Sequence, residues 1–378
     1  MPSVLYTLYI RSDMSQRIHS IDAVRALALF GILLAHAHNR FNFYVPEHAA
    51  CATDAVYDWL YQYIFVCKSF MVFAFLFGLS FFLQMDHAVA KGIDFRGRFC
   101  WRLVLLFFFG VFHSFFYQGD ILTIFSVLGF IPVLLWKLST RTIAILCGLC
   151  LCQPVVLVTE LCGYPQALYD LSEAIRCGLG INWLDPAKQN SLWETGWWNL
   201  TNGIALSWVY VIGSGRIFIL IGMFMLGMLA GRCRVFEQRP ERLLRIALVG
   251  ACIYAASFAG QQVLPVWMHW WEDTGFVLMA VPLGAWLLAR PVLVPYIAPL
   301  TAIGRCTLTC YITQNIIMAV VLCGYGFGMN PYLSTTGIMN WAMVLYVAQT
   351  LFSMYWLRSH RYGPFEAVWR KLTRIGLK

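Results

Sequence analysis

The side chains best able to do chemistry in this sequence are the few ionisable residues that interrupt its long apolar segments. One such segment follows Arg25, runs through ten residues with no ionisable group and reaches His36, with His38 two positions further on. On a helix, Arg25 and His36 share one face about 16 Å apart, whereas His38 points about 200° away from His36. Because imidazole titrates near neutral pH, His36 is a candidate general base and His38 a candidate interfacial residue beside the substrate.

The other ionisable groups expected at membrane depth are Asp22, Lys68, His113, Asp120 and Arg216. Each such group costs roughly 2.5–3.5 kcal/mol at the centre of a membrane helix, so each is a functional-site hypothesis. His113 and Asp120 flank the turn "FFYQGD", where Asp120 either orients an imidazole or caps the helix that follows it. Lys68 and Arg216 either bind substrate or form buried ion pairs that hold the bundle together.

A membrane-spanning bundle is needed to position these groups. Hydrophobic residues make up 60% of the 378 and charged residues 12%, which excludes an ordinary soluble protein, and several runs reach the roughly 20 apolar residues that span a bilayer. The predicted fold class is therefore all-α, a polytopic helical bundle. About ten transmembrane helices are expected, near 19–38, 59–84, 100–117, 120–137, 141–162, 201–230, 243–264, 273–290, 299–324 and 338–357.

Basic residues orient this predicted bundle because short cytoplasmic loops collect Lys and Arg. With the N-terminus inside, 21 basic residues fall on inner segments, and only Arg40, Arg176 and Lys188 fall on outer ones. Both termini are therefore predicted to be cytoplasmic. The net charge of +9 follows from this topology and from anionic lipid headgroups, so the bilayer is an expected partner and nucleic acid is not.

We divide the chain into a cytoplasmic N-terminal segment at 1–18, a transmembrane domain at 19–357 and a basic cytoplasmic tail at 358–378. In the tail, apolar and aromatic residues recur at helical spacing beside basic ones, which predicts an amphipathic helix along the inner membrane surface. Most of the 13 cysteines, Cys67 among them, fall inside apolar spans, where cysteine acts as a small hydrophobe. No metal-ligand spacing is evident, and no metal is expected.

Several blocks of the sequence resemble known membrane protein families. The stretch "IDAVRALALFGILLAHA" resembles the first helix of acyltransferase-3 enzymes, in which a basic residue, ten further residues and a His recur. The rest resembles the YeiB-type proteins (domain of unknown function 418), which are grouped with acyltransferase-3 in one transmembrane acyltransferase superfamily. The blocks that carry this resemblance include "HSFFYQGDILTIFSVLGF" at 113–130, "RIFILIGMFMLGMLAGR" at 216–232 and "IGRCTLTCYITQN" at 303–315. YeiB-type proteins usually carry Asn at the position of His36.

The resemblance implies an enzyme of the bacterial cytoplasmic (inner) membrane that moves an acyl group from cytoplasmic acyl-coenzyme A to a hydroxyl or amino acceptor, commonly a carbohydrate. His36, His113 and Asp120 are then the predicted catalytic residues, and His38, Lys68 and Arg216 the predicted substrate-binding residues. The residues predicted to receive the coenzyme's phosphates, through bidentate guanidinium contacts, are Arg25, Arg98, Arg102 and Arg305. For Arg98 and Arg102, the alternative explanation is the general excess of basic residues on inner loops.

Two other function classes stay open at this point. A secondary transporter uses intramembrane charges as a substrate site or proton relay, and the interruption "GSGR" at 213–216 suits a broken transporter helix. A non-enzymatic membrane scaffold needs no His–Asp set. Turnover of acyl-coenzyme A separates an enzyme from both, and the sequence leaves oligomerisation undecided.

Overall fold

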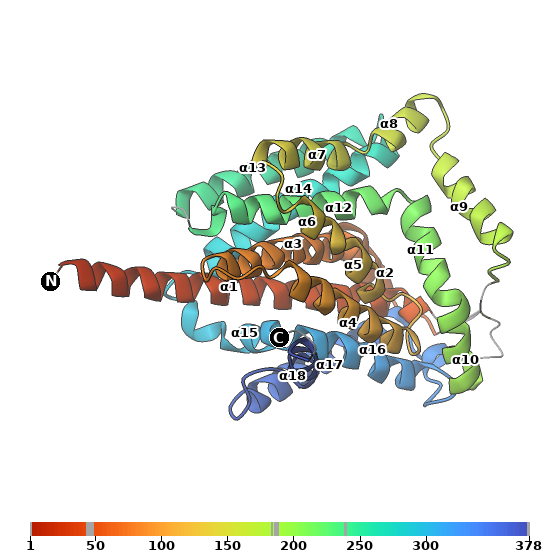
Figure 1. Cartoon of the computed structure of the whole chain (residues 1–378). Helices are drawn as coiled ribbons and strands as arrows, with labels where there is room; N and C mark the ends of the chain where they lie inside the picture. Colours follow the sequence, from red (N-terminus) through yellow and green to blue (C-terminus); the bar gives the residue numbers. More distant parts are fainter. Residues whose placement is uncertain (1, 43–48, 183, 185–188, 238–239, 376–378) are drawn as a thin grey trace.

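A computed structural model describes residues 2–42, 49–182, 184, 189–237 and 240–375, and these fold into helices joined by turns (Figure 1). No strand occurs among the described residues, so the predicted all-α class is confirmed. In chain order the α-helices are α1 (Pro2–His38), α2 (Asp54–Leu60), α3 (Lys68–Val89), α4 (Arg96–Ser114), α5 (Leu122–Leu128), α6 (Phe130–Leu135), α7 (Thr140–Cys152), α8 (Pro154–Leu161), α9 (Ala167–Gly178), α10 (Leu192–Trp198), α11 (Ile204–Gly213), α12 (Arg216–Arg232), α13 (Pro240–Gly260), α14 (Pro265–Leu288), α15 (Ala298–Arg305), α16 (Thr307–Leu322), α17 (Thr335–Trp356) and α18 (Pro364–Thr373). Shorter helical turns are η1 (Arg40–Asn42), η2 (Tyr61–Phe65), η4 (Asn199–Gly203), η5 (Val235–Glu237), η6 (Val294–Tyr296) and η7 (Asn330–Tyr332).

Fewer helices meet the requirements for crossing a membrane than the sequence predicted. In the described part of the chain, six segments are long and apolar enough: His19–His38, Asp54–Val89, Arg96–Ser114, Thr140–Leu161, Arg216–Glu237 and Pro240–Gly260. A seventh arises if α15 and α16, which meet at 83°, are counted as one broken span. The chain is thus a membrane protein, but the count of ten is not confirmed. The cytoplasmic placement of both termini stays a prediction, and Lys188, used in predicting it, lies outside the described residues.

The difference in count arises at four predicted spans: 120–137 is shorter than a span, 299–324 bends by 83°, and α14 and α17 are continuous helices that do not meet the apolar requirement. Several of the helices are also interrupted. The backbone turns left-handed at Cys67 (φ 60) before α3, and at Gln153 (φ 50), which precedes the helix-starting Pro154. Gly215 (φ 75) separates α11 from α12, so the break suspected at "GSGR" is confirmed. The 83° bend between α15 and α16 falls at Cys306. Apolar length alone does not reveal these changes of direction, because single residues set them.

Helix α1 runs through the middle of the bundle, where it packs against α3, α14, α15 and α17 (Figure 1). Helix α12 packs between α3 and α7, and α13 pairs with α14. Lipid is as apolar as the side chains in these contacts, so close packing rather than transfer from water holds membrane helices together. The described structure therefore depends on surfaces that fit one another closely.

The crossing of α3 and α12 shows how close this fit is. A Cβ atom added to Gly78 would lie 2.0 Å from the carbonyl oxygen of Phe224, and one added to Gly227 would lie 2.0 Å from that of Phe75. Only glycine permits such an approach, which is the small-residue packing typical of membrane helices. This contact fixes the start of α3 relative to the start of α12, and both starts line the cavity described below.

The predicted helix in the C-terminal tail is confirmed as α18, and it packs against the bundle. Glu366 is buried, and its carboxylate accepts hydrogen bonds from the backbone N–H groups of Leu308 (2.6 Å) and Thr309 (3.1 Å). It thereby caps the first turn of α16 just beyond the 83° bend, while burial raises the pKa of Glu366. Trp369 donates from Nε1 to the carbonyl of Arg102 at 3.1 Å, which ties α18 to α4.

Helices α9, α10 and α11 run across the end of the bundle that lies opposite the N-terminus of α1 (Figure 1). We call this the distal end. Helix α11 packs against α9, and Asn199 at the start of η4 donates to the carbonyl of Phe115, just after α4, at 3.1 Å. These three helices therefore form a cover over the distal ends of α1 and α4.

Candidate functional site

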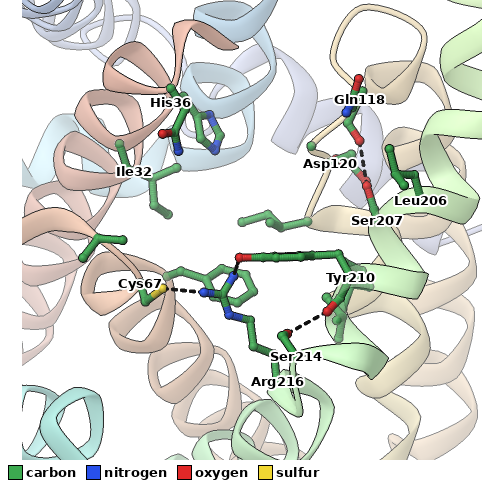
Figure 2. Close-up of a pocket in the computed structure, with 18 of the residues that line it drawn as sticks. Ile32, His36, Cys67, Gln118, Asp120, Leu206, Ser207, Tyr210, Ser214 and Arg216 are labelled. Carbon is green, nitrogen blue, oxygen red and sulfur yellow. Dashed lines mark hydrogen bonds between the residues drawn. The ribbon is translucent and has the colours of Figure 1, made fainter. Parts of the chain in front are cut away.

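Beneath this cover lies a cavity of about 1100 Å³. Figure 2 shows its walls: His36 from α1, Cys67 at the start of α3, Asp120 from the turn after α4, Tyr210 from α11 and Arg216 from α12. Apolar side chains such as Ile32 and Leu206 line the rest. A concave, mostly apolar space with a few convergent polar groups is the usual form of a small-molecule site.

A chain of hydrogen bonds leads from the cavity into the protein. His36 Nδ1 lies 3.1 Å from Oδ1 of Asn315, whose Nδ2 lies 2.8 Å from Nε2 of His113. His113 Nδ1 lies 2.7 Å from Oδ1 of Asp120. His113 and Asn315 are fully buried, at 0% exposure, whereas His36 is half-buried and lines the cavity. We call these four residues the relay. The predicted proximity of His113 and Asp120 is confirmed.

The direction of each hydrogen bond in the relay follows from the carboxylate of Asp120 at the buried end of the relay. A carboxylate only accepts, so His113 donates from Nδ1–H to Asp120, and in the neutral imidazole its Nε2 then carries a lone pair. That lone pair accepts from the amide Nδ2–H of Asn315, whose Oδ1 then accepts from Nδ1–H of His36. His36 is thereby held in the tautomer with a lone pair on Nε2. An imidazole in this state is ready to accept a proton.

The backbone around Asp120 explains why its carboxylate reaches His113. Asp120 Oδ2 accepts from the backbone N–H of Thr123 at 2.8 Å, in the first turn of α5. Gly110 on α4 faces this turn, and a Cβ there would lie 2.7 Å from the nitrogen of Thr123. Both sequence hypotheses for Asp120 therefore hold in the geometry, since it caps a helix start and orients an imidazole at once.

Aromatic rings enclose the relay. The ring of His36 lies 4.7 Å from that of Tyr117, and the ring of His113 lies 4.8 Å from that of Tyr311, measured between centroids. Both tyrosines are 3% exposed. Hydrogen bonds among polar groups are stronger where water is excluded, so this packing favours a single arrangement of the relay.

The residues predicted to bind substrate occupy three different places. Arg216 lines the cavity, and its guanidinium group donates to the Tyr210 hydroxyl and, at 2.7 Å, to Sγ of Cys67. Lys68 is fully buried and pairs with Glu272 at 2.8 Å, the arrangement expected of an ion pair between helices. His38 is not among the residues that line the cavity, and its ring stacks on another aromatic ring at 3.8 Å.

The four arginines predicted to bind phosphate have separate partners. Arg25 pairs with Asp22 at 2.6 Å, as the sequence spacing suggested, and Arg305 donates to a backbone carbonyl at 2.9 Å. Arg98 and Arg102 lie in the first two turns of α4, at the opposite end of that helix from His113. Arg102 lies over the ring of Trp369 at 4.2 Å. None of the four lines the described cavity.

Two features of the site are missing from the sequence prediction. Asn315 is neutral, so the cost of a charge at membrane depth gives no signal for it, although "YITQN" does place two amide side chains inside an apolar run. The second feature is a cluster beside Arg216 that contains Cys67, His269 and Asp273. Its place in an apolar span predicts that Cys67 is a small hydrophobe, and Asp273 lies on the predicted boundary of a helix.

Comparisons with known proteins show what this chain is similar to. Residues 230–376 match the family model "Protein of unknown function (DUF418)". The "Uncharacterized protein YeiB" of Escherichia coli (strain K12) is 27% identical, with 94% of this chain and 95% of that protein covered. "Uncharacterized protein YxaH" of Bacillus subtilis (strain 168) is 26% identical, with 96% and 95% covered. The "Uncharacterized 39.9 kDa protein in amylase 3'region" of Bacillus acidopullulyticus is 23% identical, with 95% and 94% covered.

The chain is similar to YeiB-type proteins of the DUF418 family. The family match contains Asn315 and Glu366, and the similarity to the three relatives extends over nearly the whole chain. The resemblance noted from the sequence blocks is confirmed at this level. The descriptions of these relatives assign no activity, so the function has to be argued from the site.

Proposed function

We propose that this protein is a membrane-embedded acyltransferase of the bacterial cytoplasmic membrane. In this proposal, His36 is the general base, and an acceptor hydroxyl or amino group lies in the distal cavity. The observation that carries the proposal is the relay, because it leaves the Nε2 lone pair of His36 unprotonated beside a cavity that can hold a small molecule. Asp120 and His113 are positioning residues, since they act through Asn315 on His36.

The proposed reaction balances with these groups. Nε2 of His36 takes the proton from the acceptor, the acceptor oxygen or nitrogen bonds to the thioester carbonyl carbon, and the carbon–sulfur bond breaks. The leaving coenzyme A sulfur then takes the proton from His36. A positioned general base of this kind contributes typically about 10²- to 10⁴-fold to the rate.

The donor is proposed to be acyl-coenzyme A from the cytoplasmic side. Its phosphates are proposed to contact Arg98, Arg102 and Arg305, whose guanidinium groups suit bidentate binding of phosphate. Arg25 is already engaged by Asp22 and by Ser80 Oγ at 3.0 Å, so we assign it a role in fixing α1 and only an indirect one in binding. Arg216 is proposed to orient the acceptor inside the cavity.

The test uses purified protein in lipid nanodiscs, radiolabelled acetyl-coenzyme A and a panel of carbohydrate and amino acceptors. We expect release of free coenzyme A and a labelled product, and we expect His36→Ala to lose about 10²- to 10⁴-fold of this turnover while remaining folded. His36→Asn provides the residue usual in YeiB-type proteins without a usable base. Full activity in His36→Asn would contradict the base role.

A transporter is the second candidate, favoured by the two broken helices. The helix is interrupted between α11 and α12 at Gly215 and between α15 and α16 at Cys306. Unwound helices are typical of transporter binding sites. Reconstituted vesicles with an imposed proton or sodium gradient test this directly. Gradient-driven uptake of a solute, with no turnover of acetyl-coenzyme A, would favour transport over acyl transfer.

A further inference from the structure

A group of potential metal ligands adjoins the cavity at the start of α3. Cys67, His269 and Asp273 each offer one ligand atom, and these atoms all lie within 4.8 Å of one another. Asp273 is 0% exposed, and neither of its carboxylate oxygens has a hydrogen-bond partner. A buried carboxylate without hydrogen bonds is costly, which indicates that a partner is missing from this position. We propose that Cys67, His269 and Asp273 bind a zinc ion.

The local structure brings these three side chains together. His269 and Asp273 are four residues apart on α14 and therefore share one face of that helix. Cys67 approaches from α3, where its backbone adopts φ 60 and ψ −31 directly before the first helical residue. A non-glycine residue in this conformation stores strain, and such residues concentrate at binding sites. The strained turn directs the Cys67 side chain toward the cluster.

The groups around the cluster match the usual second shell of a metal site. His269 Nδ1 lies 3.5 Å from Oε2 of Glu272, and Oε1 of Glu272 pairs with Lys68 at 2.8 Å. A carboxylate beside one ring nitrogen typically fixes a histidine so that the other nitrogen binds metal. Arg216 donates from Nη2 to Sγ of Cys67 at 2.7 Å, which places a guanidinium group beside the proposed sulfur ligand.

The donor set selects the class of ion. One sulfur, one imidazole nitrogen and one carboxylate oxygen suit Zn²⁺, which accepts all three kinds of ligand. Tetrahedral bonds of about 2.0–2.3 Å place donor atoms about 3.5 Å apart, so the ligand atoms must close in from their present spacing. Three protein ligands leave one position open. Because Cys67 lines the cavity, the proposed ion would adjoin the site where the acceptor is proposed to bind.

The competing explanation is a charge network without metal. Lys68 and Glu272 neutralise each other, which leaves His269, when protonated, and Arg216 as the counter-charges of Asp273. No hydrogen bond joins Arg216 to either oxygen of Asp273. With zinc bound, the ion neutralises the Cys67 thiolate and the Asp273 carboxylate directly. The two explanations predict different metal contents, and neither depends on the proposed acyl transfer.

The first experiment measures zinc by mass spectrometry in full-length protein purified with a tag that contains no histidine. We expect about one zinc ion per chain, as for other sites of three protein ligands. Cys67→Ser and Asp273→Asn should lose the ion, and Glu272→Gln should bind zinc about 10- to 100-fold more weakly. The matched control is Cys252→Ser, which changes an exposed cysteine of α13 and should keep the full zinc content.

The second experiment keeps the proposal falsifiable if those variants fail to fold. In wild-type protein, zinc should slow the alkylation of Cys67 by N-ethylmaleimide and leave the alkylation rate of Cys252 unchanged. Both rates are measured by peptide mass spectrometry. Cobalt substitution should give a thiolate-to-cobalt absorption band. Two results would overturn the proposal. One is an equal alkylation rate of Cys67 with and without zinc. The other is wild-type protein that retains no zinc after it has been incubated with the ion and the excess has been removed.

Discussion

The relay predicts that Asp120→Asn disables His36 by reversing the direction of every hydrogen bond between them. The amide that replaces the carboxylate can donate to Nδ1 of His113, which places the proton of His113 on Nε2. Asn315 must then present its oxygen to His113 and its Nδ2–H group to His36, because their separations of 2.8 and 3.1 Å allow no intervening water. His36 is left with its proton on Nε2, facing the cavity.

The magnitude follows from the cost of restoring the active tautomer. For Nε2 of His36 to accept a proton in this variant, the proton of His36 must move to Nδ1. Nδ1–H then faces the amide N–H of Asn315, so the hydrogen bond between these two residues is lost and a buried donor has no acceptor. Forfeiting the bond costs about 0.5–1.5 kcal/mol and the unsatisfied donor about 1–3 kcal/mol. A total of about 3 kcal/mol corresponds to about a 10²-fold loss of turnover.

A second substitution distinguishes this mechanism from simple damage to the fold. Asn315→Leu removes the connection, so His36 is no longer held in either tautomer, and we expect a loss of about tenfold from the missing hydrogen bond. When Asn315→Leu is combined with Asp120→Asn, turnover should rise from about 10²-fold below wild type in the single Asp120→Asn variant to about tenfold below wild type. The assay is release of coenzyme A by protein in nanodiscs at saturating acetyl-coenzyme A. A double variant less active than Asp120→Asn would refute the relay.

Three further predictions concern residues outside this relay. His38→Ala should lose far less turnover than His36→Ala in the same assay, because His38 does not line the cavity; an equal loss would contradict the assignment. Gly227→Val should destabilise the protein by about 1–3 kcal/mol, seen as a lower thermal midpoint in detergent, because its Cβ would overlap the backbone of Phe75. Glu366→Ala should cost about 1–3 kcal/mol by leaving the first N–H groups of α16 without an acceptor, and an unchanged midpoint would show that water replaces the carboxylate.

Part of the site was predictable because its signal is local in the chain. His36 lies at the end of an apolar run, which places it at the distal end of α1, where it does line the cavity. His113 and Asp120 are seven residues apart across one turn, so their pairing follows from chain connectivity. In both cases, a rare ionisable residue in an apolar segment was a sufficient signal.

The connection between these two parts was not predictable from one sequence. Asn315 lies 279 residues from His36 and 202 from His113, and an amide side chain at membrane depth has many ordinary roles. Its contribution depends on how α16 is placed after the bend at Cys306. Similarly, nothing in the sequence around Cys67 shows that this residue adopts a positive φ, because cysteine is not among the residue types enriched in that conformation.

The chemistry of the relay also bears on the choice between enzyme and transporter. A proton relay through a membrane needs groups that gain and lose protons in turn, such as carboxylates and imidazoles. Asn315 interrupts the path between His36 and His113, because its amide does not ionise and can only hold the direction of the hydrogen bonds. A proton taken up by His36 therefore stays on the cavity side, where a leaving group can collect it. Replacing Asn315 by Asp would insert a titratable group between the imidazoles, and we expect this variant to lose acyl transfer without gaining proton-driven uptake in vesicles.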